Sequence, residues 1–354
     1  MAPRHRIGYI DGLRAVAVLS VAVYHALHNA GKASIGAPVG VGLFFVISGF
    51  CLSYPTLLRM REDGVANFDG ASYAARRVVR ILPPYYIAIG ALVAFAWIIT
   101  RLGFGLPESM PRGGITTDDV AHALFFLDAH SRYIDWSFWT LPVEFRWYFI
   151  FPLALWLWTT SPRAFLIALA ALMFVVPFTL AANTDLFVLP AFLLGIVAAH
   201  LRLYERRWER WALPLAFLLV PLAYLQSPGF ITPLWALAMF AVVVSVGSFR
   251  VFEMVLSFRG LTVIGLASYS IYLVHQPVIL FCEARGIGPW LALFVSLLAG
   301  FAFWAAAERP FVETALRVRM LSELCGIFKK WAIWLRIKPI LRLGKPAFGE
   351  AEAA

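Results

Sequence analysis

Residues 10–29 read IDGLRAVAVLSVAVYHALHN, close to the twenty or so mostly apolar residues with which an α-helix crosses a bilayer. The whole chain of 354 residues has the same character, because 61% of its residues are hydrophobic and only 14% are charged. A soluble protein averages roughly 45–50% apolar and 25% charged residues. The composition, with a mean hydropathy of +0.78, therefore excludes a soluble globular enzyme. It predicts an all-α fold, a polytopic bundle of transmembrane helices.

Ten stretches are apolar and long enough to be candidate spans. They are residues 10–29, 38–55, 83–100, 137–158, 164–182, 185–201, 211–226, 232–249, 260–282 and 288–307. Residues 119–129 are too few to cross a membrane, and we expect them to form a surface or re-entrant helix. Pro83 and Pro84 are expected to restart the chain into the third span, because proline disfavours a helical residue before it.

The distribution of lysine and arginine predicts the topology. With the N-terminus in the cytoplasm, 23 of these residues fall in inner loops and termini and five in outer loops. This asymmetry follows the positive-inside rule and predicts both termini in the cytoplasm. It also explains the net charge of +10 without a nucleic-acid partner. We expect a multi-pass protein of the inner membrane, with residues 1–309 as the transmembrane domain and 310–354 as a basic amphipathic tail on the lipid surface.

Ionisable side chains inside a bilayer each cost about 2.5–3.5 kcal/mol, so function is expected where they occur. Arg14 and His25 lie in the first span, eleven residues apart. On a helix they differ by about 20° around the axis and about 16 Å along it. A cation and a titratable base on one stripe suit a ligand that is anionic at one end and reactive at the other. Snorkelling of Arg14 and a helix–helix hydrogen bond of His25 are the structural alternatives.

Two further spans carry polar side chains. Glu144 is a carboxylate in the fourth span, suited to orienting a histidine or an acceptor hydroxyl, with a structural ion pair as the alternative. In the ninth span, Ser268, Tyr272 and His275 share one helix face. This stripe lines either a cavity or a helix interface.

An arginine cluster precedes the third span, in the sequence SYAARRVVRILPP. Arg76, Arg77 and Arg80 share a helix face there, and guanidinium groups bind phosphates bidentately. Positive-inside topology alone would produce the same cluster. The three cysteines are too few for a disulfide framework, and no cluster of ligand residues indicates a metal.

Taken together, these segments resemble acyltransferase family 3, which includes bacterial O-acetyltransferases of surface polysaccharides. The matching stretches are IDGLRAVAVLSVAVYH, GVGLFFVISGF, RRVVRILPPYY, WTLPVEFRWYFIFPL and SYSIYLVHQPV, in the order of the family. The resemblance does not extend to the extracytoplasmic SGNH-type domain that is appended in some members of the family, so a mechanism with two modules is not expected. It assigns no role to Arg146.

The resemblance implies transfer of an acyl group, often acetyl, from cytoplasmic acyl-CoA to a hydroxyl of a glycan, glycolipid or glycoside, without a metal. Its arginine and histidine motif falls on Arg14 and His25, and its arginine pair falls on Arg77 and Arg80. We expect the arginines to hold the CoA phosphates and His25 to act as general base or to carry the acyl group. Glu144 would assist the reaction, while the acceptor site would be lined by Ser268, Tyr272 and His275. A secondary transporter, a lipid-linked sugar flippase and a scaffold are the rival interpretations.

Overall fold

The computed structural model describes residues 7–29, 31, 36–64, 66–103, 115–127, 135–178, 184–227, 232–334 and 340–343. Residues 179–182 of the predicted span 164–182, residues 335–339 and 344–354 of the predicted tail, and residues 1–6 lie outside this part of the chain. Helices make up almost all of it. They are α1 (Gly8–Asn29), α2 (Gly36–Asp63), α3 (Gly70–Arg101), α4 (Thr117–Phe125), α5 (Thr140–Thr160), α6 (Pro162–Val175), α7 (Thr184–Tyr204), α8 (Arg206–Gln226), α9 (Pro233–Ser248), α10 (Arg250–Leu256), α11 (Arg259–Leu266), α12 (Ser268–Glu283), α13 (Pro289–Phe303), α14 (Arg309–Glu313) and α15 (Ala315–Trp334).

Short elements complete the fold. Two 3-10 turns, η2 (Trp136–Trp139) and η3 (Val176–Phe178), adjoin α5 and α6, and a π-helical turn, η4 (Trp304–Glu308), joins α13 to α14. Strands β1 (Ala66–Asp69) and β2 (Ile340–Leu343) pair antiparallel as a single ribbon. The all-α prediction therefore holds for the described residues apart from this ribbon.

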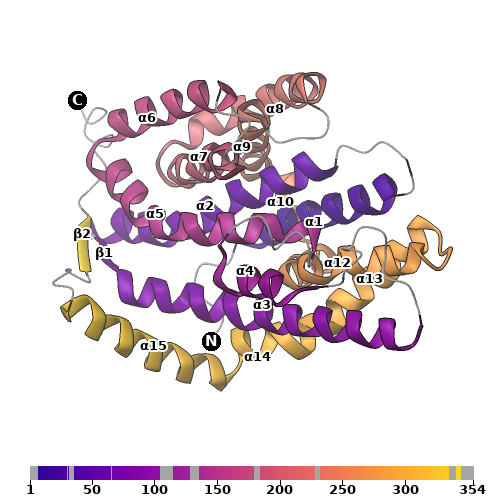
Figure 1. Ribbon diagram of the computed structural model, residues 1–354. Helices are drawn as coiled ribbons and strands as arrows, with labels where there is room; N and C mark the ends of the chain where they lie inside the picture. Colours follow the sequence, from indigo (N-terminus) through magenta and orange to yellow (C-terminus); the bar gives the residue numbers. More distant parts are fainter. Residues whose placement is uncertain are drawn as a thin grey trace, which may run out of the picture.

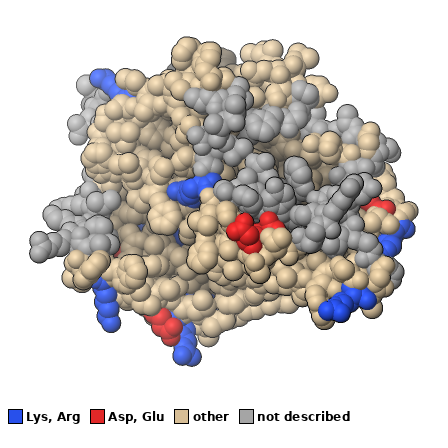
Figure 2. Space-filling view, in the orientation of Figure 1, with Lys and Arg blue, Asp and Glu red and all other residues tan. Residues whose placement is uncertain are grey.

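The helices form one bundle around α1 and α2 (Figure 1). In that view α6, α8 and α9 lie above the central pair, while α3, α14 and α15 lie below it. Figure 2 shows that few charged side chains interrupt this face of the molecule. Many exposed side chains are large and apolar, among them Trp97, Phe149 and Phe217. Such a surface fits a lipid environment.

Five helices are long and apolar enough to cross a membrane, and up to seven segments are if each bent pair counts as one span. The five are Gly8–His28, Gly36–Asp63, Gly70–Arg101, Leu186–Tyr204 and Pro289–Glu313; the bent pairs are α9 with α10 and α11 with α12. Each predicted span overlaps a described helix or a bent pair. The count of ten spans and the cytoplasmic placement of the termini stay predictions.

The predicted continuous span 260–282 is divided in the structure. A bend of 72° separates α11 from α12. Gly265, just before the bend, lies so close to α1 that a Cβ added to it would be 1.8 Å from the carbonyl oxygen of Asp11. Helix α11 thus packs against α1 at backbone contact and is not collinear with α12.

The expectation that Pro83 and Pro84 restart the chain is wrong. Helix α3 runs unbroken from Gly70 to Arg101, through both prolines. Proline in a membrane helix is tolerated where neighbouring groups bind the freed backbone carbonyls. The carbonyls that Pro83 and Pro84 leave free are those of Val79 and Arg80, and the Tyr269 hydroxyl donates to the next one, the carbonyl oxygen of Ile81, at 3.0 Å. As a result, the arginines before the prolines belong to the same helix as the apolar span after them.

Glycines let α2 and α7 cross at backbone contact. A Cβ on Gly49 would lie 2.0 Å from the carbonyl oxygen of Phe192, and one on Gly195 would lie 2.3 Å from that of Val46. Small residues at such crossings are typical of membrane helix pairs. The crossing holds α2, which carries several residues of the cavity described below, against α7.

The C-terminal segment packs back on the bundle. Helix α15 lies along α3 (Figure 1), where Lys329 Nζ is 4.0 Å from Asp69 Oδ2. Asp69 also caps α3, accepting from the backbone N–H of Ser72 at 3.1 Å. Strand β2 then pairs with β1, Leu343 opposite Ala66. The boundary at residue 309 and the contact of this segment with lipid stay predictions.

Candidate functional site

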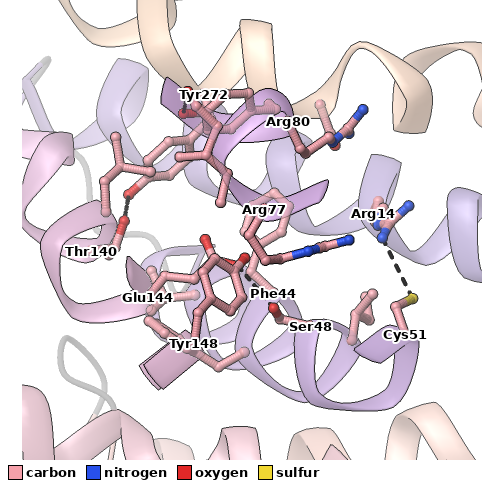
Figure 3. A pocket seen from close by; sticks show the side chains of 17 residues that line it. Arg14, Phe44, Ser48, Cys51, Arg77, Arg80, Thr140, Glu144, Tyr148 and Tyr272 are labelled. Atoms are coloured by element: carbon pink, nitrogen blue, oxygen red, sulfur yellow. Dashed lines mark hydrogen bonds between the residues drawn. The ribbon is translucent and has the colours of Figure 1, made fainter. Parts of the chain in front are cut away.

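A cavity of about 120 Å³ lies among α1, α2, α3, α5 and α12. Figure 3 shows the side chains that surround it. Six of the eight residues predicted for the site line it, and they are Arg14, Arg77, Arg80, Glu144, Ser268 and Tyr272. The structure therefore brings together predicted residues from three predicted spans and the arginine cluster. His25 and His275 lie outside this lining.

Two of the three arginines are paired with carboxylates. Arg14 Nη1 lies 3.1 Å from Asp11 Oδ1, one turn earlier on α1, and Arg14 Nη2 donates to Cys51 Sγ at 3.4 Å. Arg80 Nη1 lies 3.0 Å from Oε1 of Glu308, on the π-helical turn. These pairs fix both guanidinium groups at the cavity edge.

Arg77 is held differently. Its guanidinium lies 5.7 Å from the centre of the Tyr148 ring, a cation–π contact. Among the described residues, its buried Nε has no hydrogen-bond partner, and no carboxylate forms an ion pair with it. Figure 3 shows this side chain between Glu144 and Arg14. Buried polar groups are normally hydrogen-bonded, so the unpartnered Nε of Arg77 is an exception among the described residues.

Hydroxyl groups surround Glu144. Ser48 Oγ donates to Glu144 Oε1 at 2.8 Å, and the Tyr148 hydroxyl donates to the same oxygen. Among the described residues, Glu144 is therefore held by hydroxyl groups and not by the ion pair that was its structural alternative. The carboxylate is therefore fixed in the cavity wall, where it can accept a hydrogen bond from a ligand hydroxyl.

Tyr272 connects the cavity to the two histidines. Its hydroxyl donates to the carbonyl oxygen of Ser137 at 2.6 Å and lies 2.7 Å from Thr140 Oγ1. Its ring centre is 5.6 Å from that of His275, which in turn is 5.2 Å from that of His25. A chain of rings therefore leads from the cavity to His25.

His275 has a defined tautomer. Its side chain is fully buried, and its Nδ1 lies 2.8 Å from the carbonyl oxygen of Tyr272. A carbonyl only accepts, so Nδ1 carries the proton of the neutral ring and Nε2 keeps a lone pair. Nε2 has no partner among the described residues. His275 is the ring that lies next to His25. The expectation that Glu144 orients His25 stays a prediction.

Asp135 is a buried acid outside the predicted spans, at the start of η2. Burial raises its pKa to about 7, although the backbone N–H and hydroxyl of Ser137 both donate to it at 2.7 Å and lower the pKa. The carboxyl binds Ser137, whose carbonyl oxygen accepts from the hydroxyl of Tyr272 in the cavity lining. It therefore titrates close to neutral pH.

The sequence analysis missed several residues of this region. Ser48, Thr140 and Tyr269 are uncharged and common in apolar helices, so no pattern marks them. Glu308 does carry a signal, since it is a carboxylate one residue beyond the last predicted span. Arg146, for which no role was assigned, donates from Nη1 to the carbonyl oxygen of Phe126 at 3.2 Å, at the end of α4.

Helix α4, Thr117–Phe125, overlaps the segment 119–129 that was expected to form a short helix, of which residues 128 and 129 lie outside the described part of the chain. Its N-terminus has a capping box in which Thr116 and Asp119 bind each other's backbone N–H groups. Among the described residues, no group of three or more His, Cys, Asp or Glu side chains is arranged to hold a metal ion.

Curated relatives of the chain are O-acetyltransferases by name. The O-acetyltransferase OatA of Staphylococcus aureus is 25% identical over 98% of this chain and 63% of its own length. The putative peptidoglycan O-acetyltransferase YrhL of Bacillus subtilis is 31% identical over 41% of this chain and 23% of its own. For the peptidoglycan O-acetyltransferase OatA of Listeria monocytogenes the values are 27%, 46% and 27%. The chain thus spans less than two thirds of these relatives.

No solved structure matches the chain. The family whose profile matches is described as an acyltransferase domain, and the match covers residues 7–309. It includes the three arginines, both histidines and Glu144, as well as Glu308. Since most of the chain is matched, this protein belongs to the acyltransferase family 3 that its motifs resemble.

Proposed function

We propose that the protein is a membrane O-acetyltransferase that moves an acetyl group from acyl-CoA to a hydroxyl of a glycan. The observation that carries the proposal is the cavity in which Arg77, a cation without a carboxylate partner among the described residues, lies beside Glu144. The names of the relatives make peptidoglycan strands the first acceptor to test.

The charges of the cavity support an anionic donor. Three guanidinium groups and a single carboxylate line it. Guanidinium groups bind phosphate oxygens through paired, charge-assisted hydrogen bonds. Placing such charges inside an apolar bundle costs free energy, and the phosphates of acyl-CoA would offset this cost when bound.

The proposed chemistry uses two positions on α1, at Arg14 and at His25. Arg14 lies at the cavity, and His25 lies about 16 Å further along the helix, next to His275. His25 removes the proton of the acceptor hydroxyl, whose oxygen attacks the thioester carbonyl. The C–S bond breaks, and the imidazolium gives its proton to the leaving sulfur, so that CoA departs as the free thiol. Attack by His25 itself, giving an acyl-histidine, is the second route to the same product.

The test is transfer of labelled acetyl from acetyl-CoA to peptidoglycan fragments in membranes. We expect His25→Ala to reduce transfer by at least about 100-fold, the lower end of general-base contributions. His28→Ala is the matched control, because His28 lies one turn after His25 on α1 and stacks on Tyr24. Full transfer by His25→Ala would refute the assignment of the base. Movement of a glycan without release of free CoA thiol would support a transporter instead.

A further inference from the structure

Glu308 is a fully buried carboxylate that the proposed chemistry does not use. Its exposed fraction is 0%, and it is the last residue of the π-helical turn η4. An isolated buried carboxylate is strongly disfavoured, so its surroundings must compensate its charge. π-helical turns also occur frequently at functional sites.

Three elements meet at this carboxylate. Ser270 of α12 donates from Oγ to Glu308 Oε2 at 2.6 Å, and Arg80 of α3 places Nη1 3.0 Å from Oε1. One residue along α12, the Tyr269 hydroxyl donates to the carbonyl oxygen of Ile81, next to Arg80. The guanidinium of Arg80 is therefore held by Glu308, and the backbone of the next residue is held by Tyr269.

Arg80 itself faces two ways. Its side chain is 32% exposed and lines the cavity, while its partner carboxylate is inaccessible. A guanidinium has five N–H donors, so donors remain for a ligand after the pair with Glu308 is made. A long side chain that is already ordered loses less conformational freedom when a ligand binds.

We propose that Glu308 is a positioning residue, which holds Arg80 in the orientation that binds a phosphate of acyl-CoA. The proposal rests on the proposed function for its ligand, and it adds a residue from the far end of the chain to the donor site. Among the described arginines of the cavity, Arg14 is oriented from its own helix by Asp11. Arg80 differs because a helix more than 200 residues away supplies its carboxylate.

The first experiment tests, without any substrate, whether Glu308 restrains the side chain of Arg80. Purified wild type and Glu308→Gln are treated with phenylglyoxal, and modification of Arg80 is followed by peptide mass spectrometry. We expect Arg80 to react at least about threefold faster in the variant. Glu313→Gln is the matched control, because it breaks an exposed pair with Arg309 at 2.9 Å, and Arg80 should keep its wild-type rate there. Unchanged Arg80 reactivity in Glu308→Gln would overturn the positioning role.

The second experiment measures acetyl-CoA kinetics in a double-mutant cycle with Arg80→Gln. We expect Glu308→Gln to raise KM for acetyl-CoA about tenfold, with kcat within threefold. In the Arg80→Gln background it should add nothing, because the group on which it acts is gone. An equal further rise in that background, or a lower KM in the single variant, would overturn the proposal.

Failure of folding and failure of the donor assignment remain distinguishable. If Glu308→Gln alone does not fold, the double variant with Arg80→Gln tests the pairing, because both positions are then neutral. Recovery of the folded double variant would support the pairing, and its loss would count against the pairing. If wild type does not use acetyl-CoA, the proposed function fails, whereas the phenylglyoxal result still decides whether Glu308 holds Arg80.

Discussion

Replacing Arg77 by glutamine would remove the cavity cation that has no described carboxylate partner. The change keeps a polar side chain against Tyr148 but removes the charge and the guanidinium donors. A hydrogen bond to a charged group contributes about 1.5–3 kcal/mol. Each 1.4 kcal/mol corresponds to about tenfold in affinity. KM for acetyl-CoA should therefore rise roughly 10- to 150-fold, measured by initial rates of acetyl transfer in reconstituted membranes.

The neighbouring residue offers a matched control. Arg76 has the same charge and lies on the same helix, yet it is exposed and does not line the cavity. Arg76→Gln should change KM less than about threefold, as expected for an exposed charge that salt screens. Equal effects of the two substitutions would mean that only the overall charge of this surface matters. That result, or an unchanged KM in Arg77→Gln, would refute the assignment of Arg77 to the donor site.

Three further outcomes are expected. Glu144→Gln should lower kcat about 100-fold, because it removes a carboxylate that can accept a proton or orient the acceptor; a fall in kcat below threefold would contradict this. Gly195→Ala should lower the melting temperature in detergent, because its Cβ would lie 2.3 Å from the carbonyl oxygen of Val46 and overpacking costs about 1–3 kcal/mol. Gly90→Ala, where a Cβ meets open space, should leave the melting temperature equal or higher. Asp135, with its pKa raised by burial to about 7, keeps a proton that the unfolded chain loses near pH 4. The free energy of unfolding should therefore fall as pH rises from about 4 to 7, and Asp135→Asn should flatten this dependence in melting curves at pH 5 and 8.

The gathering of the arginines and Glu144 could be predicted from the sequence because charged residues are rare and costly in apolar helices. Such side chains are expected to lie next to other polar groups inside the bundle, and one cavity is lined by Arg14, Arg77, Arg80 and Glu144. The helical class followed from hydropathy alone for the same reason.

The arrangement around the histidines could not be predicted in this way. His25 and His275 share no local pattern, and their contact depends on how α12 leaves the bend after Gly265. The pairing of Arg80 with Glu308 likewise depends on the π-helical turn within FAFWAAAERP, which no residue in that stretch signals. Backbone contacts between distant helices determine both, and these are properties of the packed bundle rather than of any segment.

The ribbon between β1 and β2 has a consequence for biosynthesis. Strand β1 immediately precedes the arginine-bearing helix, but its partner lies some 270 residues later. At about 5–20 residues per second, translation takes roughly 15–55 s to deliver β2 after β1 has been made. During that interval the start of α3 lacks this strand contact, so stalling of the ribosome before residue 340 would leave β1 unpaired before the helix that carries Arg77 and Arg80.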